Sequence, residues 1–146
     1  MMFNFPPYHI IYGIGTDICK ISRIEKLYHQ YSDAFLKRVY SPAEQDKFHA
    51  LAEKLKIPFL AKRFAAKESC VKALKTGFGH AALMRDVEIL NNDTGVPQVT
   101  LYNKALFTAQ TIAKGQKFDF FMSLSDDSDF AQAFCIFALA THHEQE

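Results

Sequence analysis

The sequence predicts a single domain that contains both helices and strands. Between residues 18 and 75, apolar side chains recur at the three- and four-residue spacing of helices. From Asp86 onward, short apolar runs alternate with turn residues instead. At 146 residues, with 49% hydrophobic and 23% charged residues, the chain can bury one ordinary globular core.

The composition excludes several other classes of protein. A net charge of +1 gives no reason to expect nucleic acid as the main partner. The N-terminal stretch lacks a basic segment and is broken by Pro6 and Pro7, so we do not expect a signal peptide, and no apolar run is long enough for a membrane span. Cys19, Cys70 and Cys135 lie in apolar settings without a C-x-x-C pair, which indicates buried reduced thiols and a cytoplasmic protein.

The chain opens with a loose leader over residues 1–8 and a short strand, HIIYGI, over residues 9–14. GIGTD follows, but a dinucleotide-binding fingerprint would need a third glycine at Ile18. We therefore interpret Gly13 and Gly15 as releasing the backbone from the strand. Asp17 is then the N-cap of the next helix, a functional carboxylate, or both.

Three helical segments come next. Residues 18–30 form an amphipathic pattern, with Lys20 and Arg23 on the polar side, and residues 33–38 add another turn. Ser41, Pro42 and Glu44 then have the order of a helix start with a capping box. We expect this third helix to continue to Pro58, with an apolar side made of Phe48, Leu51 and Leu55.

The central segment, FLAKRFAAKESCVKALKTGFG over residues 59–79, is predicted to be a helix and its exit. One stripe is apolar and is formed by Leu60, Phe64, Val71 and Leu74. The neighbouring stripe holds Ala61, Ala65, Glu68 and Lys72, so that small residues would let a partner approach two opposite charges. Glu68 and Lys72 are either a surface pair worth about 0.2–0.5 kcal/mol or a functional pair.

The last part of the chain is predicted to hold two hairpins and a helix. Strands over residues 86–90 and 97–102 flank NNDTGV, and a helix follows over residues 103–114. A final hairpin joins FDFFMSL to FAQAFCIFALA around SDDSD, and we expect it to be buried on both faces. The tail, residues 141–146, carries His142 and His143, for which metal binding is a minor alternative.

Six motifs now stand in order along the chain: GIGTDI at 13–18, SPAEQ at 41–45, RFAAKESCVKA at 63–73, TGFG at 76–79, GVP at 95–97 and SLS at 123–125. With these motifs the chain resembles the holo-[acyl-carrier-protein] synthases, the small bacterial 4'-phosphopantetheinyl transferases. The resemblance extends from about Ile11 to Ala140.

The resemblance implies a magnesium-dependent transfer of 4'-phosphopantetheine from coenzyme A to a serine of acyl carrier protein, in fatty acid biosynthesis. It also implies a single-domain α+β fold with an antiparallel sheet packed on helices, and a homotrimer with active sites between protomers. An apolar interface agrees with the phenylalanines of the final hairpin, Phe118, Phe120, Phe121, Phe134 and Phe137.

The same resemblance implies roles for individual residues. Asp17 and Glu68 would hold Mg²⁺, and Lys72 would lie at the diphosphate as a catalytic cation. Lys20 and Arg23 would dock the acidic carrier protein. The coenzyme A site would be lined by Arg63, Lys67, Lys72, Thr76, Gly77, Gly79 and Ser125. Glu44 and Asp46 are candidates to activate the serine hydroxyl, although the capping box explains Glu44 equally well.

Some positions depart from the family pattern. Asp126 stands where a histidine is usual, and it would be either a third metal ligand or a turn residue. Gln30 and Asp33 stand where basic residues are frequent. A metal-dependent hydrolase of phosphoanhydrides, which would use the same carboxylates and lysine, stays open as an alternative. A non-catalytic module that binds coenzyme A or the carrier is the other alternative, and Asp126 is its best support.

Overall fold

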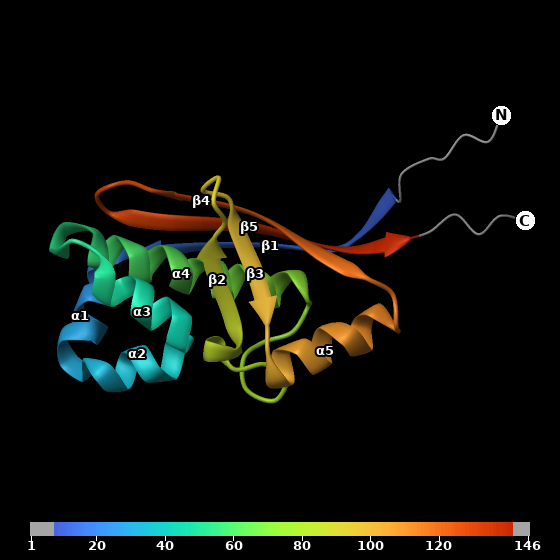
Figure 1. The fold of residues 1–146 in the computed structure, drawn as a ribbon, viewed down its shortest axis with the longest axis horizontal. Coiled ribbons are helices and arrows are strands. Elements are labelled where there is room, and N and C mark those ends of the chain that lie inside the picture. The colour runs from blue at the N-terminus through green and yellow to red at the C-terminus, as the bar shows by residue number, and fades with distance from the viewer. Residues whose placement is uncertain (1–7, 142–146) are drawn as a thin grey trace, which may run out of the picture.

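The computed structural model describes residues 8–141, and its centre is a sheet packed on one long helix (Figure 1). Strands β1 (Tyr8–Lys20), β5 (Phe130–Thr141) and β4 (Phe118–Asp126) form an antiparallel sheet in the order β1-β5-β4. Helix α4 (Glu53–Ala73) lies along one face of this sheet. The predicted α+β class is confirmed. His142 and His143 of the tail, for which metal binding was a minor alternative, lie outside the described residues.

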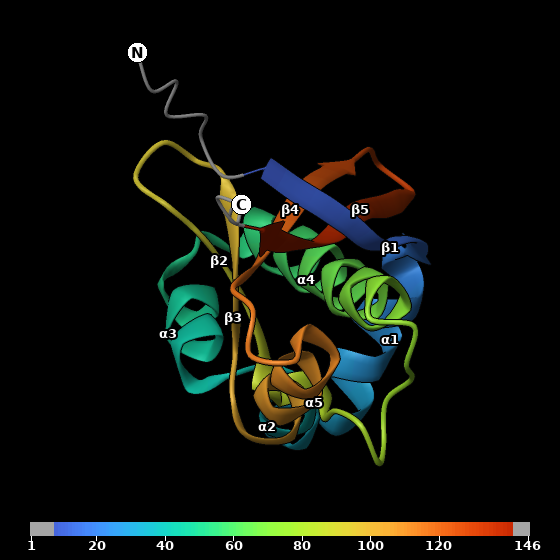
Figure 2. The same ribbon diagram turned by 90° about the vertical axis from the view of Figure 1, so that its right-hand side faces the viewer.

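The remaining elements surround α4 (Figures 1 and 2). Helices α1 (Ile21–Tyr31), α2 (Asp33–Val39) and α3 (Pro42–Ala50) gather near one end of it. The hairpin of β2 (Val87–Asn91) and β3 (Pro97–Leu101) contacts α4 through β2 and β4 through β3. A short 3-10 turn, η1 (Met84–Asp86), precedes that hairpin, and α5 (Asn103–Ala113) follows it.

Strand β1 is longer than the sequence pattern indicated, and its glycines pack against α4 instead of releasing the backbone from the strand. Asp17 lies inside the strand, whereas Lys20 is the N-cap residue of α1. A Cβ atom on Gly13 would lie 1.9 Å from the carbonyl oxygen of Ala73, and one on Gly15 would lie 1.8 Å from that of Ser69. The two glycines therefore let the strand backbone touch the backbone of α4, rather than ending the strand.

The boundary between α3 and α4 also differs from the expectation. The capping box is confirmed, because the Ser41 side chain accepts the Glu44 N–H and the Glu44 carboxylate accepts the Ser41 N–H. However, α3 ends at Ala50, and Pro58 lies inside α4. Proline there removes one hydrogen bond near the start of the helix, where the neighbouring residues are partly exposed and water can replace it. Leu55 is 48% exposed and belongs to no core stripe.

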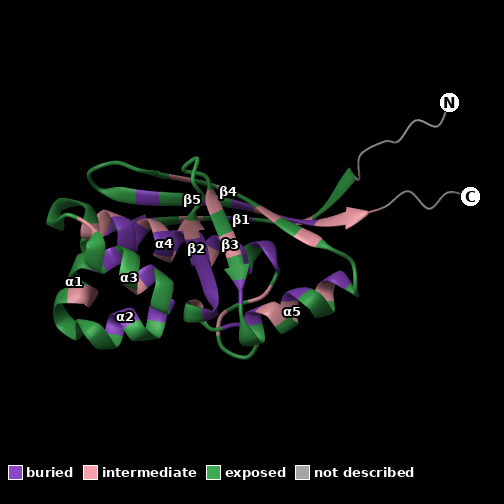
Figure 3. Ribbon diagram, viewed as in Figure 1, coloured by how far each residue is buried: buried purple, intermediate pink, exposed green. Residues whose placement is uncertain are grey.

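The sheet buries one face and leaves the other open (Figure 3). Alternate residues of β5, Ala131, Ala133, Cys135 and Phe137, are buried on the side of α4. Ile14 and Ile18 of β1, Phe121 of β4 and Phe134 of β5 are between 42% and 64% exposed. No described helix covers that face (Figure 2). The expectation of a hairpin buried on both faces is therefore wrong for the single chain.

Alternation along the strands also divides the phenylalanines that we expected at an interface. Phe118, Phe120 and Phe137 pack against one another on the inner side of the sheet. Phe121 and Phe134 lie on the open face. None of the helices within residues 8–141 is both long enough and apolar enough to cross a membrane.

The contact between β1 and α4 predicts a strong effect of one methyl group. Gly15→Ala should lower the free energy of unfolding by about 2 kcal/mol or more, because the added Cβ overlaps the Ser69 carbonyl and one of the two elements must shift. Urea denaturation measures this change. Gly77→Ala is the matched control, since a Cβ there meets no atom within 4 Å, and it should be nearly neutral. Equal stability of the two variants would contradict the contact.

Candidate active site

Asp17 and Lys72 meet where β1 crosses α4. The Lys72 ammonium donates to the backbone carbonyl of Thr16 at 2.8 Å and lies 3.3 Å from Asp17 Oδ1. The Asp17 side chain is 19% exposed, whereas the Lys72 side chain is 51% exposed. The close packing of β1 on α4 thus presents a carboxylate from the strand and an ammonium from the helix at one edge of the molecule.

Glu68 lies one helical turn before Lys72 on α4 and is half-buried. Burial raises the pKa of the Glu68 carboxyl, and the negative charge of Asp17 raises it further, while Lys72 and Arg23 lower it. The Asp17 carboxylate is thus near enough to Glu68 to disfavour its charged form. Among the described residues, no side chain donates a hydrogen bond to Glu68 or pairs with it.

The first helix contributes a basic side to this edge. The Arg23 guanidinium lies 5.8 Å from the centre of the Phe64 ring, so α1 and α4 meet there. Lys20 and Arg23 are both exposed. Burial and Asp17 raise the pKa of the nearby Cys19 thiol to about 11, which keeps this cysteine protonated and unreactive.

The donor set of this edge fits a hard divalent cation. Mg²⁺ is bound through one or two carboxylates and retains water molecules and phosphate oxygens as its other ligands. Asp17 and Glu68 supply two carboxylates, and Glu68 has no competing partner. Residues 8–141 hold no group of three or more histidine, cysteine, aspartate or glutamate side chains that could bind a metal without such additional ligands.

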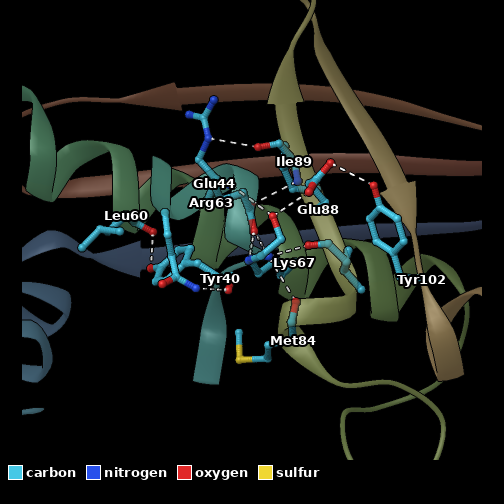
Figure 4. Close-up of polar contacts among 12 residues, drawn as sticks. Tyr40, Glu44, Leu60, Arg63, Lys67, Met84, Glu88, Ile89 and Tyr102 are labelled. Atoms are coloured by element: carbon cyan, nitrogen blue, oxygen red, sulfur yellow. Dashed lines mark hydrogen bonds and ion pairs between the residues drawn. The ribbon is translucent and has the colours of Figure 1, made fainter. Parts of the chain in front are cut away.

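Glu44 and Lys67 lie in the interior, where they form an ion pair (Figure 4). The Lys67 ammonium lies 2.6 Å from Glu44 Oε1 and also donates to the carbonyls of Met84 and Val87, and both side chains are fully buried. The second carboxylate oxygen of Glu44 accepts the Ile89 N–H at 3.1 Å. Burial lowers the pKa of Lys67, and Glu44 opposes that change.

This ion pair ties α3, α4 and β2 together, and its burial bears on two of the expected roles. Glu44 was a candidate base and Lys67 a candidate coenzyme A ligand. Neither side chain reaches the surface of the single chain. The sequence showed the capping box of Glu44 but not its buried partner, because the pairing joins residues 23 positions apart on different helices.

The chain has known relatives along most of its length. Residues 13–135 match the model of the 4'-phosphopantetheinyl transferase superfamily. A holo-[acyl-carrier-protein] synthase of Orientia tsutsugamushi (strain Ikeda) is 44% identical over 127 residues, which cover 87% of this chain and 96% of the relative. The chain belongs to the 4'-phosphopantetheinyl transferase superfamily.

Solved structures of such transferases share the fold. The holo-[acyl-carrier-protein] synthase of Neisseria meningitidis superposes with a TM-score of 0.78 at 33% identity, covering 88% of this chain and 98% of that one. The synthase of Helicobacter pylori, solved in complex with coenzyme A, gives a TM-score of 0.70 at 31% identity, with 85% and 98% coverage. The expected resemblance is therefore confirmed.

Other residues expected in a transferase site are dispersed over the monomer. Arg63 is nearly buried: its guanidinium stacks 4.2 Å from the centre of the Phe59 ring and donates to the Asn91 side chain of β2 at 3.2 Å. Thr76, Gly77 and Gly79 lie in the loop after α4, and Gly79 has a positive φ of 117°. Ser125 is exposed near the end of β4, and Asp46 is exposed on α3.

Asp126 has a partner that the sequence did not indicate. Its Oδ1 lies 3.3 Å from the Lys62 ammonium of α4. The turn after β4 is held by Asp127 instead, whose carboxylate accepts the N–H groups of Asp129 and Phe130. Those two bonds lower the pKa of Asp127. Asp126 therefore does not hold the turn, and within the described chain it joins no cluster with Asp17 and Glu68.

The buried ion pair predicts that Glu44 matters for stability. Glu44→Gln leaves the Lys67 ammonium in the interior without its counter-charge, which should cost about 3–5 kcal/mol of unfolding free energy. Chemical denaturation measures the loss. Asp46→Asn, an exposed position on the same helix, should change stability by less than about 0.5 kcal/mol. A Glu44→Gln protein of normal stability but without activity would instead favour Glu44 as the base.

The proximity of Asp17 and Glu68 predicts coupled titration. Asp17→Asn should lower the pKa of Glu68, because the neutral amide no longer disfavours the charged form, and Lys72→Met should raise it. Carboxyl chemical shifts recorded by NMR as a function of pH report this pKa directly. Asp119→Asn, which removes a carboxylate from the far end of β4, should leave Glu68 unchanged. A Glu68 pKa that ignores Asp17 would contradict the shared site.

Proposed function

We propose that this protein is a holo-[acyl-carrier-protein] synthase, which transfers 4'-phosphopantetheine from coenzyme A to a serine of apo acyl carrier protein. The observation that carries the proposal is the meeting of Asp17, Glu68 and Lys72 where β1 crosses α4. Proteins named holo-[acyl-carrier-protein] synthase match most of the chain, and the related protein from Helicobacter pylori was solved in complex with coenzyme A.

In the proposed reaction, the carrier serine oxygen forms a bond to the phosphorus that bears the pantetheine arm. The bond between that phosphorus and the bridging oxygen of the diphosphate breaks, and adenosine 3',5'-bisphosphate leaves. The serine proton passes to a base or to water. Because phosphoryl transfer requires mainly positioning and charge stabilisation, a protein with few reactive groups can catalyse it.

Lys72 is suited to the diphosphate, since its side chain is about half exposed and its ammonium lies beside Asp17. Asp17 and Glu68 would hold Mg²⁺, which when bound neutralises phosphate charge and orients the diphosphate. We expected Ala61 and Ala65 to let a partner approach the helix beside these charges. Both are fully buried by protein atoms, so they serve helix packing rather than ligand access.

The serine proton needs an acceptor. Glu44 is confined to its ion pair, whereas Asp46 is exposed and stays a candidate.

The ion pair between Lys62 and Asp126 bears on the alternative of a non-catalytic module. Because Lys62 balances the Asp126 charge, an aspartate at this position need not repel the phosphates of coenzyme A.

We further propose that the protein acts as a homotrimer, with active sites completed between protomers. The open sheet face supports this assembly, because Ile14, Ile18, Phe121 and Phe134 form an exposed apolar surface of the kind that marks an interface. Residues expected at the coenzyme A site, such as Ser125 on β4 and Lys72 on α4, lie on different elements, and in the proposed trimer one protomer supplies some of them and its neighbour the others.

Lys20 and Arg23 would dock the acidic carrier beside this site. Both are exposed, and Arg23 is close enough to Glu68 to lower its pKa. Docking through α1 would therefore bring the carrier serine to the two carboxylates. A cytoplasmic location and a role in fatty acid biosynthesis belong to the same proposal, and three buried free thiols agree with a reducing compartment.

Activity tests the proposal directly. The purified protein, incubated with coenzyme A, Mg²⁺ and apo carrier, should add phosphopantetheine to the carrier, as mass spectrometry detects, and release adenosine 3',5'-bisphosphate in equal amount. Glu68→Ala should reduce the rate by more than the roughly 10–100-fold typical of residues that only support metal ligands. Glu53→Gln, a change at an exposed glutamate of the same helix, should have no effect. Adenosine 3',5'-bisphosphate without modified carrier would indicate a hydrolase.

Assembly is tested by light scattering at micromolar concentration. The wild-type protein should have three times the mass of the chain. Phe134→Glu should dissociate it, because a charge would be buried in the apolar interface. Phe107→Glu is the control, since Phe107 is 71% exposed but lies on α5, away from the open sheet face. A monomeric wild-type protein would contradict shared active sites.

A further inference from the structure

An ion pair joins the two edge strands of the main sheet across its central strand. His9 of β1 and Asp119 of β4 lie on either side of β5, and His9 Nε2 is 2.6 Å from Asp119 Oδ2. Their side chains are 35% and 56% exposed. The His9 ring also meets the Phe121 ring edge-on, with 5.3 Å between the ring centres. His9 precedes residues 13–135, so the pair depends on a residue beyond the segment that matches the superfamily model.

The strand register places this pair on the open sheet face. Residues directly opposite each other in neighbouring strands point to the same face of a sheet. The β5 partners of Phe121, Asp119 and His9 are the alternate residues 136, 138 and 140. Phe121 is 46% exposed, whereas the intervening Phe137 is buried. The pair therefore continues the exposed apolar surface that includes Phe121.

Assembly through this face would remove the pair from water. The proposed trimer buries Phe121, and the His9 ring already packs on that side chain. With His9 protonated, the pair has no net charge. With His9 neutral, the Asp119 carboxylate keeps a charge that nothing in the pair cancels. A buried ion without its partner is strongly destabilising, so assembly should favour the protonated form of His9.

Lys117 is the other charged side chain beside the pair. Together with His9 and Asp119 it lines a cavity of about 600 Å³ between the end of α5 and the start of β4. Lys117 is exposed and forms no ion pair within residues 8–141. Gln110 and Gln116, which also line the cavity, carry no charge. A lysine ammonium and an aspartate carboxylate keep their charges between pH 5 and 8, so His9 is the group here whose charge changes in that range.

We propose that protonation of His9 controls the assembly of this protein, so that the trimer dissociates more readily as the pH rises through the neutral range. Association takes up a proton wherever His9 is neutral in the free chain, and this uptake makes the equilibrium depend on pH. Active sites shared between protomers would depend on the same equilibrium. The inference rests on the proposed homotrimer.

Light scattering over a dilution series at pH 6 and at pH 8 tests the inference. The concentration at which half of the wild-type trimer has dissociated should be at least about 10-fold higher at the higher pH. His9→Asn should remove this difference and give the weaker assembly at both pH values, because Asp119 then never has a counter-charge. Asp119→Asn should reverse the sign, because protonated His9 is then the unpaired charge and assembly weakens as the pH falls.

His29→Asn is the matched control. His29 lies 3.7 Å from Glu25, so it forms a similar pair, but on helix α1 rather than on the open sheet face. This variant should retain the wild-type dependence on pH. Where the wild-type trimer persists at the lowest concentration, the urea concentration that halves the scattering mass replaces the dilution midpoint. Circular dichroism of the same samples separates dissociation from unfolding.

A wild-type trimer with the same midpoint at both pH values would overturn the inference and leave the homotrimer intact. Equal effects of His9→Asn and His29→Asn would also overturn it, as would an Asp119→Asn variant that responds to pH in the same direction as the wild type. A protein that is monomeric at both pH values would contradict the homotrimer itself, and this inference with it.

Discussion

The direct backbone contact between β1 and α4 is the constraint on which the site depends. A side chain at Gly13 or Gly15 would overlap a helix carbonyl, so the strand can lie at this distance only with glycine at both positions. Asp17 follows on the same strand, two residues after Gly15. The strand therefore carries its carboxylate to the edge where Glu68 and Lys72 emerge from the helix. The motif GIGTD combines the packing requirement and the Asp17 carboxylate in five residues.

Helix α4 directs the charges of Lys67 and Glu68 to two different sides of the helix. Successive residues of a helix point about 100° apart, so Lys67 and Glu68 enter different environments. Lys67 turns inward to Glu44 and to the carbonyls of Met84 and Val87, where it holds α3 and the start of β2. Glu68 turns to the edge of β1 and has no such partner. One lysine is thus structural, and the next lysine along the chain, Lys72, is available for chemistry.

The sequence predicted what depends on local pattern and on motifs. The helix start at Ser41 and the hairpin around Gly95 follow from capping and turn chemistry, and the α+β class follows from the family motifs. The pairing of Asp126 with Lys62, and of Lys67 with Glu44, could not be predicted, because each joins elements that only the fold brings together. The role of the glycines was misjudged for the same reason. Period-two alternation in β4 and β5 would have separated the inward phenylalanines from the outward ones.

The central claim is that close packing of β1 on α4 creates the cation site. Titration with Mn²⁺, a hard ion that can replace Mg²⁺ and broadens nearby NMR signals, tests it most directly. The amides of residues 16–18 and of Glu68 should broaden first, whereas those of the buried Glu44 should not. In a Gly15→Ala protein that remains folded, the affinity for Mn²⁺ should fall at least about 10-fold. Unchanged Mn²⁺ affinity in that variant would contradict the account.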